Sequence, residues 1–412
     1  MGIFLGRIKK VTIFFVMVGI CVALVACSSD NNASLDSSSN NSNTSGGNKE
    51  DIKIDHPPWY KEPSDRVKEV AKLPDLTGKT VSQGPNGSDP FPANELELTE
   101  EDISELKKGN YTAAISFHYL GNDWSTLQMR AIKDQMGEYG IEIIATTDAG
   151  FEDMQQITDI KSIAAKKPDI LFSIPVNPST TASAYKEIAE DGTKVIFMDQ
   201  PAEGLEPGKD YVSVVSSDNT IAGMMQADFM HDAIGDNGEI AMLYYGPDFL
   251  VANQRYEGFI ARAQEKYPDM KIVETQGFTD VMDTQGIAAG LLTKHPDLDG
   301  MDVNWDVPAM GVVAAARVKG IKREDFAVTH NFLGNEAALN MAQHGYIKGI
   351  GAQTPYQQGI AEAKVAALAL LGKDTPVYIA VPPVGVTRDN LLESYNYIYG
   401  KDPAKEIIDA LN

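Results

Sequence analysis

Polar and aromatic side chains follow the short apolar runs of this sequence, at the points where the runs end. Amide, carboxylate and imidazole groups donate or accept hydrogen bonds, and tryptophan and phenylalanine offer flat apolar faces. That combination suits a ligand that carries many hydroxyl groups around weakly apolar C–H faces. The residues predicted to bind such a ligand are His118, Asn122, Trp124, Asp199, Gln200, Asn253, Phe278, Trp305, Asp306, Asn331 and Gln353.

These residue types predict a neutral ligand bound by many modest contacts. Each hydrogen bond contributes roughly 0.5–1.5 kcal/mol, and a buried partner left unsatisfied by a wrong ligand costs about 1–3 kcal/mol. No arginine stands at the ends of the apolar runs, so a carboxylate or phosphate would lack a bidentate partner there. The set therefore favours a sugar or polyol over an amino acid or a sugar phosphate.

Structural roles are the alternative for the same residues. Trp124 could be a core aromatic, Trp305 could pack between lobes, and Asp199 could cap the next segment. A structural role is the favoured interpretation for Asp218–Asn219, which would cap a helix beginning near residue 220, and for Arg255, in an ion pair.

No metal or cofactor is expected. Asp297, Asp299 and Asp302 lie close together, but they lack the 12-residue calcium loop with glycine at its sixth position. The motifs Gly-x-Ser-x-Gly, P-loop and His-Glu-x-x-His are absent, so the sequence does not suggest an enzyme.

Alternating apolar runs and amphipathic segments must position these residues. Such alternation predicts parallel α/β sheets, in which ligands bind outside the carboxyl ends of the strands. The runs expected to form strands are 112–117, 141–146, 170–174, 195–198, 211–215, 239–243, 271–275, 301–303, 326–329 and 348–352. The segments with helical periodicity are 124–139, 153–166, 180–190, 220–234, 253–267, 284–295, 308–319, 335–344 and 355–371. So many strands exceed one compact sheet and predict two lobes.

The N-terminus predicts export and a lipid anchor. A basic start is followed by the uncharged run 11–26, which is short for a membrane span of about 20 residues but typical of a signal peptide. The run ends in Leu24-Val25-Ala26-Cys27, which resembles a bacterial lipobox, so residues 1–26 would be removed and Cys27 lipidated. An ordinary secretory signal and an uncleaved anchor helix are the alternatives.

Composition separates the rest of the chain into a tether, an extension and a folded body. Residues 27–56 are rich in Ser and Asn and predict a flexible tether, and 57–110 form an extension of unknown role with a capping box at Thr99. Both cysteines, Cys21 and Cys27, lie at the N-terminus, so the body has no disulfide. The formal net charge is −23, and about −26 without the three basic residues of the signal, which excludes nucleic acid as a partner.

From about residue 111 to 400, the order and spacing of several motifs resemble the type I periplasmic binding proteins, the ribose-binding-like sugar receptors. The motifs are Leu-Gly-Asn-Asp-Trp at 120–124, a strand ending in Asp199, Ser-Asp-Asn at 217–219 followed by Gly223, Arg-Tyr-Glu-Gly-Phe at 255–259, Leu-Leu at 291–292, His-Pro-Asp at 295–297, and Gly-Ala-Gln-Thr-Pro-Tyr at 351–356 followed by Gly359.

The resemblance implies two Rossmann-like lobes joined by a three-crossing hinge near 216, 354 and 380, which closes on ligand. Lobe 1 would comprise residues 111–216 and 355–380, and lobe 2 residues 217–354 and 381–412. In the family's positions, Trp124 would stack on a sugar ring, Asn122 and Gln353 would make polar contacts, and Asp199 would accept hydrogen bonds from hydroxyls.

Departures from the ribose receptors leave the sugar open. Those receptors carry arginine where this chain has Gln200 and Asn253, and asparagine where it has Trp305. The late Gly-x-Asp-Gly segment reads Asn-Phe-Leu-Gly at 331–334.

Together with the lipobox-like sequence, which predicts the lipid anchor, the resemblance implies an extracytoplasmic, lipid-anchored, monomeric solute-binding protein that delivers a sugar or polyol to the permease subunits of an ABC transporter. The alternative is a receptor that passes a sugar-like signal to a chemoreceptor or histidine kinase. A repressor of the same core fold would need a basic helix-turn-helix where this chain has a signal peptide.

Overall fold

A computed structural model describes residues 54–412. They belong to one structural unit, residues 51–412. The predicted signal peptide, the lipidation site Cys27 and the tether up to residue 53 lie outside the described residues.

The first lobe is built on a sheet in which every strand pairs in parallel, with the order β1-β12-β6-β5-β4-β2-β3. The strands are β1 Phe91–Pro92, β2 Thr112–Phe117, β3 Glu142–Asp148, β4 Ile170–Ser173, β5 Lys194–Met198, β6 Ser213–Ser217 and β12 Tyr378–Val381. The helices are α2 Glu100–Leu106, α3 Asp123–Glu138, α4 Asp153–Ala164, α5 Ala182–Glu190 and α11 Pro355–Leu370.

Alternation along the strands explains why helices cover both faces of this sheet. Ile115 and Phe172 join the core on the side of α3 and α11, whereas Ala114 and Leu171 join the core on the side of α4 and α5. Successive side chains of a strand point to opposite faces, so a continuous apolar run needs two layers of helix.

The second lobe has the strand order β13-β11-β10-β9-β7-β8, in which only β13 runs antiparallel to its neighbour. The strands are β7 Glu239–Tyr245, β8 Lys271–Phe278, β9 Gly300–Val303, β10 Ala327–Asn331, β11 Ile347–Ala352 and β13 Val384–Val386. The helices are α6 Asn219–Ile234, α7 Leu250–Lys266, α8 Thr284–Lys294, α9 Asp306–Lys319, α10 Asn335–Ala342, α12 Leu391–Tyr399 and α13 Lys405–Leu411.

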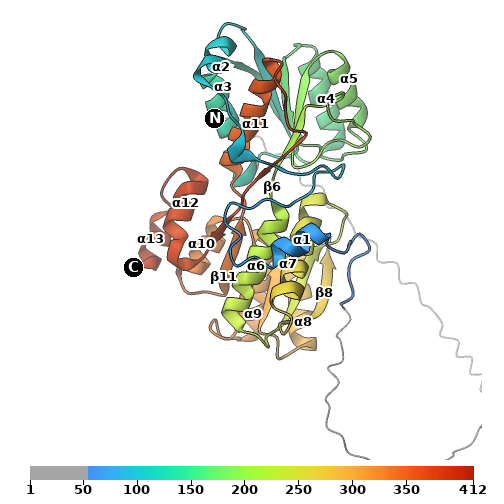
Figure 1. Cartoon of the computed structure of the whole chain (residues 1–412). Coiled ribbons are helices and arrows are strands. Elements are labelled where there is room, and N and C mark those ends of the chain that lie inside the picture. Colours follow the sequence, from blue (N-terminus) through green and yellow to red (C-terminus); the bar gives the residue numbers. More distant parts are fainter. Residues whose placement is uncertain (1–53) are drawn as a thin grey trace, which may run out of the picture. The chain divides into compact units, whose positions relative to one another are not determined.

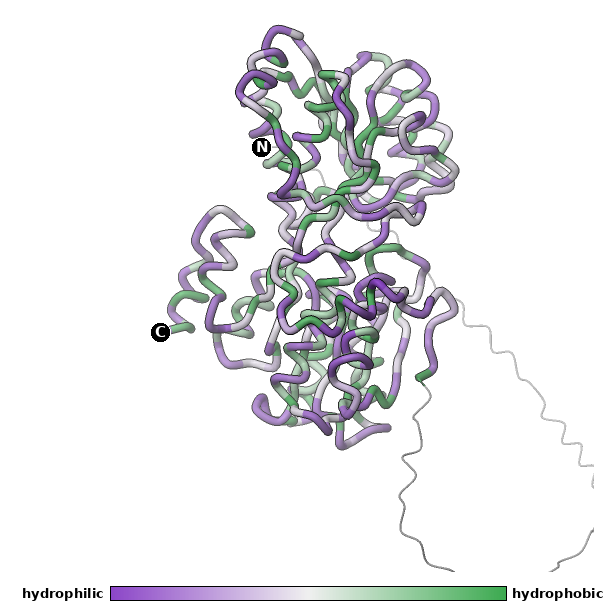
Figure 2. The backbone as a smooth tube through the Cα atoms, in the orientation of Figure 1, coloured by the Kyte–Doolittle hydropathy of each residue, from purple (hydrophilic) through white to green (hydrophobic). Residues whose placement is uncertain are grey.

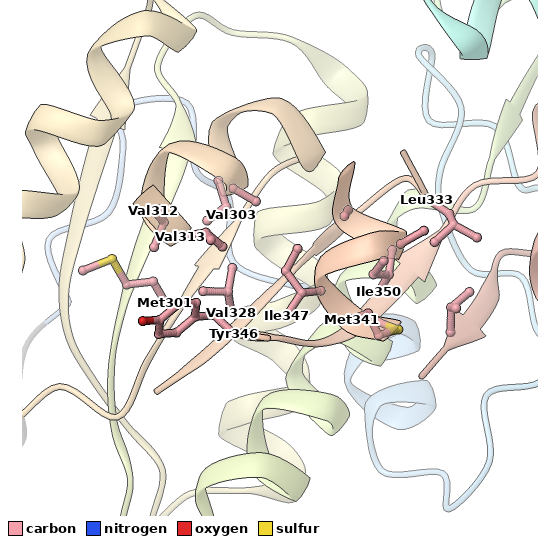
Figure 3. Close-up of a cluster of buried hydrophobic side chains, with 14 of the residues drawn as sticks. Met301, Val303, Val312, Val313, Val328, Leu333, Met341, Tyr346, Ile347 and Ile350 are labelled. Atoms are coloured by element: carbon pink, nitrogen blue, oxygen red, sulfur yellow. The ribbon is translucent and has the colours of Figure 1, made fainter. Parts of the chain in front are cut away.

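The core of the second lobe interleaves strand and helix side chains. Figure 3 shows Met301 and Val328 from β9 and β10 beside Val312 and Val313 of α9, with Met341 of α10 near Ile350. In Figure 2 the apolar stretches run along the strands of both lobes, and the hydrophilic stretches lie mainly on outer helices and loops. The prediction of two Rossmann-like lobes with parallel sheets is confirmed.

The chain changes sheet three times. It passes from β6 directly into α6, returns between β11 and α11, and leaves again between β12 and β13. The first and third crossings are joined where the amide of Asp218 donates to the carbonyl of Val381 at 2.8 Å. The first and third crossings are therefore hydrogen-bonded to each other between the two lobes.

The extension before residue 111 contains α1 Asp65–Ala71, β1, the 3-10 turn η1 Ala93–Glu95 and α2. The capping box predicted at Thr99 is confirmed: its hydroxyl accepts from the amide of Asp102 at 3.2 Å, and its own amide donates to the Asp102 carboxylate at 3.1 Å.

All the predicted apolar runs form strands, whereas some boundaries and elements differ from the prediction. Helix α7 begins at Leu250, three residues before the predicted start, so Asn253 lies inside a helix. The short strands β1, β12 and β13 and the helices α1, α12 and α13 were not predicted. Among residues 54–412, no helix is long and apolar enough to cross a membrane, and no metal-holding group of three or more His, Cys, Asp or Glu occurs.

Candidate functional site

A cleft of about 1540 Å³ lies at the carboxyl ends of the strands of both sheets. This is where parallel α/β sheets present their loops and helix N-termini to a ligand. Eight of the predicted residues line it: His118, Asn122, Trp124, Asp199, Trp305, Asp306, Asn331 and Gln353.

An aromatic group on the first lobe follows β2 and β3. The ring of His118 meets Trp124 edge-on, with centroids 6.0 Å apart, and meets Phe151 in the same way at 5.1 Å. Burial without a hydrogen-bond partner for Nδ1 lowers the pKa of His118 to about 4. The imidazole is therefore neutral at pH 7 and can exchange a hydrogen bond with an uncharged ligand.

Asn122 positions Trp124 through local structure. Its side-chain oxygen accepts from the amide of Ser125 at 2.8 Å and so caps α3, which starts one residue later. The cap places Trp124 in the first turn of the helix, at the wall of the cleft. Asn122 thus has a structural role as well as a place in the cleft lining.

A second aromatic group lies on the opposite lobe. Trp305 precedes α9 and contacts Tyr245 edge-on at 5.4 Å and Phe278 at 5.3 Å. Phe278 is only 2% exposed and supports the Trp305 ring from behind, without lining the cleft itself. The cleft consequently has one tryptophan on each lobe.

Asp199 places a buried carboxylate at the floor of the cleft. It follows β5 with a φ of 59°, a left-handed conformation that aspartate tolerates better than most residues. Its Oδ1 accepts from Ser216 Oγ at 2.9 Å and from Gln358 Nε2 at 3.1 Å. Burial raises the pKa of Asp199, while these two donors and the nearby charge of Arg255 oppose that shift. The carboxylate is thus oriented by its neighbours.

Arg255 lines the cleft from α7 and is largely buried, with 6% of its surface exposed. Its Nε donates to Asn219 Oδ1 at 2.9 Å, and one Nη donates to the carbonyl of Asn304 at 3.3 Å. Burial lowers its pKa to about 10, and Asp199 and Asp306 act in the opposite direction. The guanidinium is still charged at pH 7, and these two contacts hold it in place.

Close packing of α6 on α7 brings Arg255 to Asn219. A Cβ on Gly223 would lie 2.0 Å from the carbonyl oxygen of Arg255, and a Cβ on Gly258 would lie 2.1 Å from that of Thr220. Real Cβ contacts are essentially never shorter than 3.0 Å, so only glycine permits this approach. The glycine pair therefore determines how near the arginine comes to the crossing segment.

Asp306 contributes a second, nearly buried carboxylate at the N-terminus of α9. Burial raises its pKa to about 7, backbone amides of the helix start oppose the shift, and Asp123 and Glu336 add to it. A Cβ on Gly334 would lie 2.0 Å from Asp306 Oδ2, so this side chain packs directly on the backbone of the connection after the neighbouring strand β10.

Three predicted residues do not line the cleft. Gln200 is buried, and the Asn253 side chain donates to the Asp248 carboxylate at 2.6 Å from within α7. Phe278 supports Trp305, as described above. For Asn253 the prediction placed the residue after a strand, whereas α7 already begins at Leu250.

Other lining residues were missed by the sequence analysis. Arg255 was assigned to a structural ion pair, but its hydrogen bonds go to amide and carbonyl oxygens and it lines the cleft. Tyr245 was missed because β7 was expected to end at residue 243, two residues too early. Phe151 and Phe249 lie in connections after β3 and β7, and their place beyond the strand ends was the available signal.

The family model for the periplasmic binding protein domain matches residues 113–374. The ribose import binding protein of Bacillus subtilis is 27% identical over 277 residues, which cover 67% of this chain and 87% of that protein. The D-ribose/D-allose-binding protein of Pseudomonas aeruginosa is 23% identical and covers 69% of this chain and 81% of that protein.

Solved structures share the fold. A solute-binding protein of Actinobacillus succinogenes with bound D-allose has a TM-score of 0.60 at 23% identity, covering 68% of this chain and 99% of that one. One from Agrobacterium vitis, bound with α-D-tagatopyranose, has a TM-score of 0.63 at 21% identity and covers 71% and 100%. With most of its folded body matched by the family model, and with both lobes, the crossings and the cleft in place, the chain belongs to the periplasmic binding protein domain family.

Proposed function

We propose that this chain captures a small neutral sugar or polyol between its lobes and delivers it unchanged to the permease subunits of an ABC transporter. The observation that carries the proposal is a cleft with a tryptophan on each lobe and a hydrogen-bonded carboxylate, Asp199, at its floor. Relatives named for ribose and allose, and similar structures with bound D-allose and tagatose, support a sugar. The comparisons give no support to the alternative role in signalling.

Charge in the cleft supports a neutral ligand, although an arginine is present. The carboxylates that line it are Asp123, Asp199, Asp280, Asp306 and Glu336. Against these stands Arg255, whose Nε and one Nη already donate to Asn219 and Asn304. An anionic ligand would be repelled by the charged carboxylates among these. The single guanidinium, already engaged by Asn219 and Asn304, offers it little attraction in return.

A thermal-shift screen tests the ligand class. Residues 28–412, which lack the predicted signal peptide and Cys27, are heated with pentoses, hexoses, polyols, amino acids and sugar phosphates. A ligand at 100 times its Kd adds about 2.7 kcal/mol of stability, which gives a clear rise in Tm. Stabilisation by a neutral sugar or polyol supports the proposal, whereas stabilisation only by amino acids or sugar phosphates would overturn it.

We also propose that Cys27 becomes lipidated after removal of residues 1–26, which would hold the receptor at the outer surface of a membrane as a monomer. The support is the lipobox-like sequence before Cys27. Metabolic labelling with a fatty-acid analogue in a bacterial host should label the chain and the Cys21→Ser control, but not Cys27→Ser. Equal labelling of both variants would exclude this anchor.

A further inference from the structure

The extension before residue 111 is fastened to the second lobe at its beginning. The indole of Trp59 donates to the carbonyl of Gly246 at 3.0 Å, and its ring meets Tyr256 edge-on at 5.5 Å. Further along, Arg262 of α7 donates to the carbonyls of Ala71 and Leu73 at 2.7 and 2.6 Å. Figure 1 shows α1 lying against the helices of this lobe, next to α7.

The same segment then becomes part of the first lobe. A Cβ on Gly84 would come within 2.7 Å of the Tyr378 ring, and Asn86 donates to the Tyr211 hydroxyl at 3.1 Å. After that β1 pairs in parallel with β12 at the edge of the first sheet. The chain has therefore passed from one lobe to the other between residues 82 and 86, which makes this a fourth crossing segment.

At the crossing, Val81 and Ser82 hold the carboxylate of Asp218, which lies between β6 and α6 in the first crossing segment. Both backbone amides donate to Asp218 Oδ2, that of Ser82 at 2.9 Å, and the Ser82 hydroxyl donates to Oδ1 at 2.8 Å. The amide of Thr220 in turn donates to Ser82 Oγ at 2.9 Å. Ser82 and Asp218 are both fully buried. A buried carboxylate needs such donors, so the extension supplies much of what keeps Asp218 in place.

The residue after Asp218 connects this contact to the cleft. Asn219 Oδ1 accepts from Arg255 Nε at 2.9 Å and from Gln353 Nε2 at 3.3 Å, and both donors line the cleft. Asn219 Nδ2 donates to Ser216 Oγ at 3.2 Å, and that hydroxyl donates to Asp199. Ser82 is therefore hydrogen-bonded to both chain neighbours of Asn219, and Asn219 in turn is hydrogen-bonded to side chains at the floor of the cleft.

We infer that Val81 and Ser82 are positioning residues for the binding cleft, and that residues 54–92 form a fourth inter-lobe connection built into the receptor. The extension fixes Asp218, Asp218 fixes the start of α6, and Asn219 at that start orients Arg255 and Gln353. The consequence for affinity rests on the proposed function, whereas the ordering of the cleft floor does not.

A pair of matched variants in residues 28–412 tests the inference. Ser82→Ala removes the hydroxyl that joins Asp218 to Thr220. Thr99→Ala removes a capping hydroxyl from α2 in the same extension, away from the crossing. Amide hydrogen exchange of the ligand-free proteins is compared by mass spectrometry in peptides that contain Asn219, Arg255 and Gln353. Binding of D-ribose and D-allose to the wild type and to both variants is measured separately by calorimetry.

We expect faster exchange in all three peptides of Ser82→Ala and unchanged exchange there in Thr99→Ala, although both variants melt at a lower temperature. The Kd of Ser82→Ala for a sugar that the wild type binds should rise about two- to thirtyfold, the usual range for mutations along a coupled network. Equal exchange in the two variants would overturn the inference. The extension would then only pack on the surface of the lobes, without positioning residues of the cleft. Wild-type protein that binds no sugar would count against the proposed function alone, because the exchange comparison needs no ligand.

Discussion

Replacing Gly258 by alanine tests whether the contact between α6 and α7 determines both stability and binding. The added Cβ would lie 2.1 Å from the carbonyl oxygen of Thr220 and 2.9 Å from its carbonyl carbon. Since the obstacle is backbone, no side-chain rotation can relieve it, and the helices must separate by about 1 Å to reach an ordinary contact distance.

The expected cost combines two opposing effects. Overpacking of this kind costs about 1–3 kcal/mol, and the rigid backbone obstacle places Gly258→Ala near the upper end. Alanine regains about 1 kcal/mol through its higher helix propensity. The free energy of unfolding should therefore fall by about 2 kcal/mol. Ligand affinity should fall too, because the 2.9 Å bond between Arg255 and Asn219 spans the same helix pair and weakens as it lengthens.

The control is Gly290→Ala in the middle of α8, where an added Cβ meets nothing within 4 Å. Urea unfolding followed by circular dichroism should show that variant to be about 1 kcal/mol more stable than the wild type, with unchanged ligand affinity. If Gly258→Ala were as stable as Gly290→Ala, the close approach of the two helices would not exist in solution. The account of how Arg255 reaches the cleft floor would then be wrong.

Three other perturbations address the cleft and its buried groups. Asp199→Ala removes the acceptor at the floor, so calorimetry should show the sugar Kd rising about ten- to hundredfold, and an unchanged Kd would mean that the ligand lies elsewhere. Arg255→Met should weaken binding of the same sugar, because Asn219 and Gln353 lose a fixed neighbour, and tighter binding would contradict this. His330 is buried with its pKa lowered to about 4, so the folded protein keeps it neutral where the unfolded chain is protonated. The stabilisation that the neutral imidazole gives the folded state is fully present above pH 6.5, and it is lost as the pH falls towards 4 because only the unfolded chain then binds a proton. In urea titrations the free energy of unfolding of the wild type should therefore exceed that of His330→Gln by less and less across that range.

The sequence predicted most of the fold because the signals are local. A parallel strand that is buried on both faces is apolar at every position, so a run of a few residues such as β4 identifies it without knowledge of its neighbours. The elements that were missed are short or depend on distant partners. Strand β1 has two residues and exists because β12 offers a free edge for pairing. Nothing in residues 91–92 alone could indicate that partner.

The candidate site was predictable where it follows directly from a strand end, as for Asp199 and Trp305. It was not predictable where a helix delivers a residue from its side. Arg255 reaches the cleft because two glycines let α7 approach α6, and periodicity within α7 does not reveal its distance from another helix. Gln200 was a natural expectation beside Asp199, but Asp199 has a left-handed backbone, and Gln200 does not line the cleft.

The cleft floor places ligand-facing side chains next to the segments that join the two lobes. Ser216, Asn219 and Gln353 lie at or beside the crossing segments. Ser216 donates to Asp199, Asn219 accepts from Arg255, and Gln353 donates to Asn219. A ligand bound to Asp199 or Gln353 therefore contacts residues that either lie on a crossing or are held by one, rather than only the walls of the cleft. A ligand can shift an equilibrium between open and closed lobes only through contacts that differ between the two states. In a hinge closure the crossing segments absorb the change in backbone angles, and the contacts that differ most between the two states are those that a ligand makes with both lobes at once. Trp124 and Trp305, one on each lobe, are placed to make such contacts, and Asp199 and Gln353 hold the ligand next to the segments that turn.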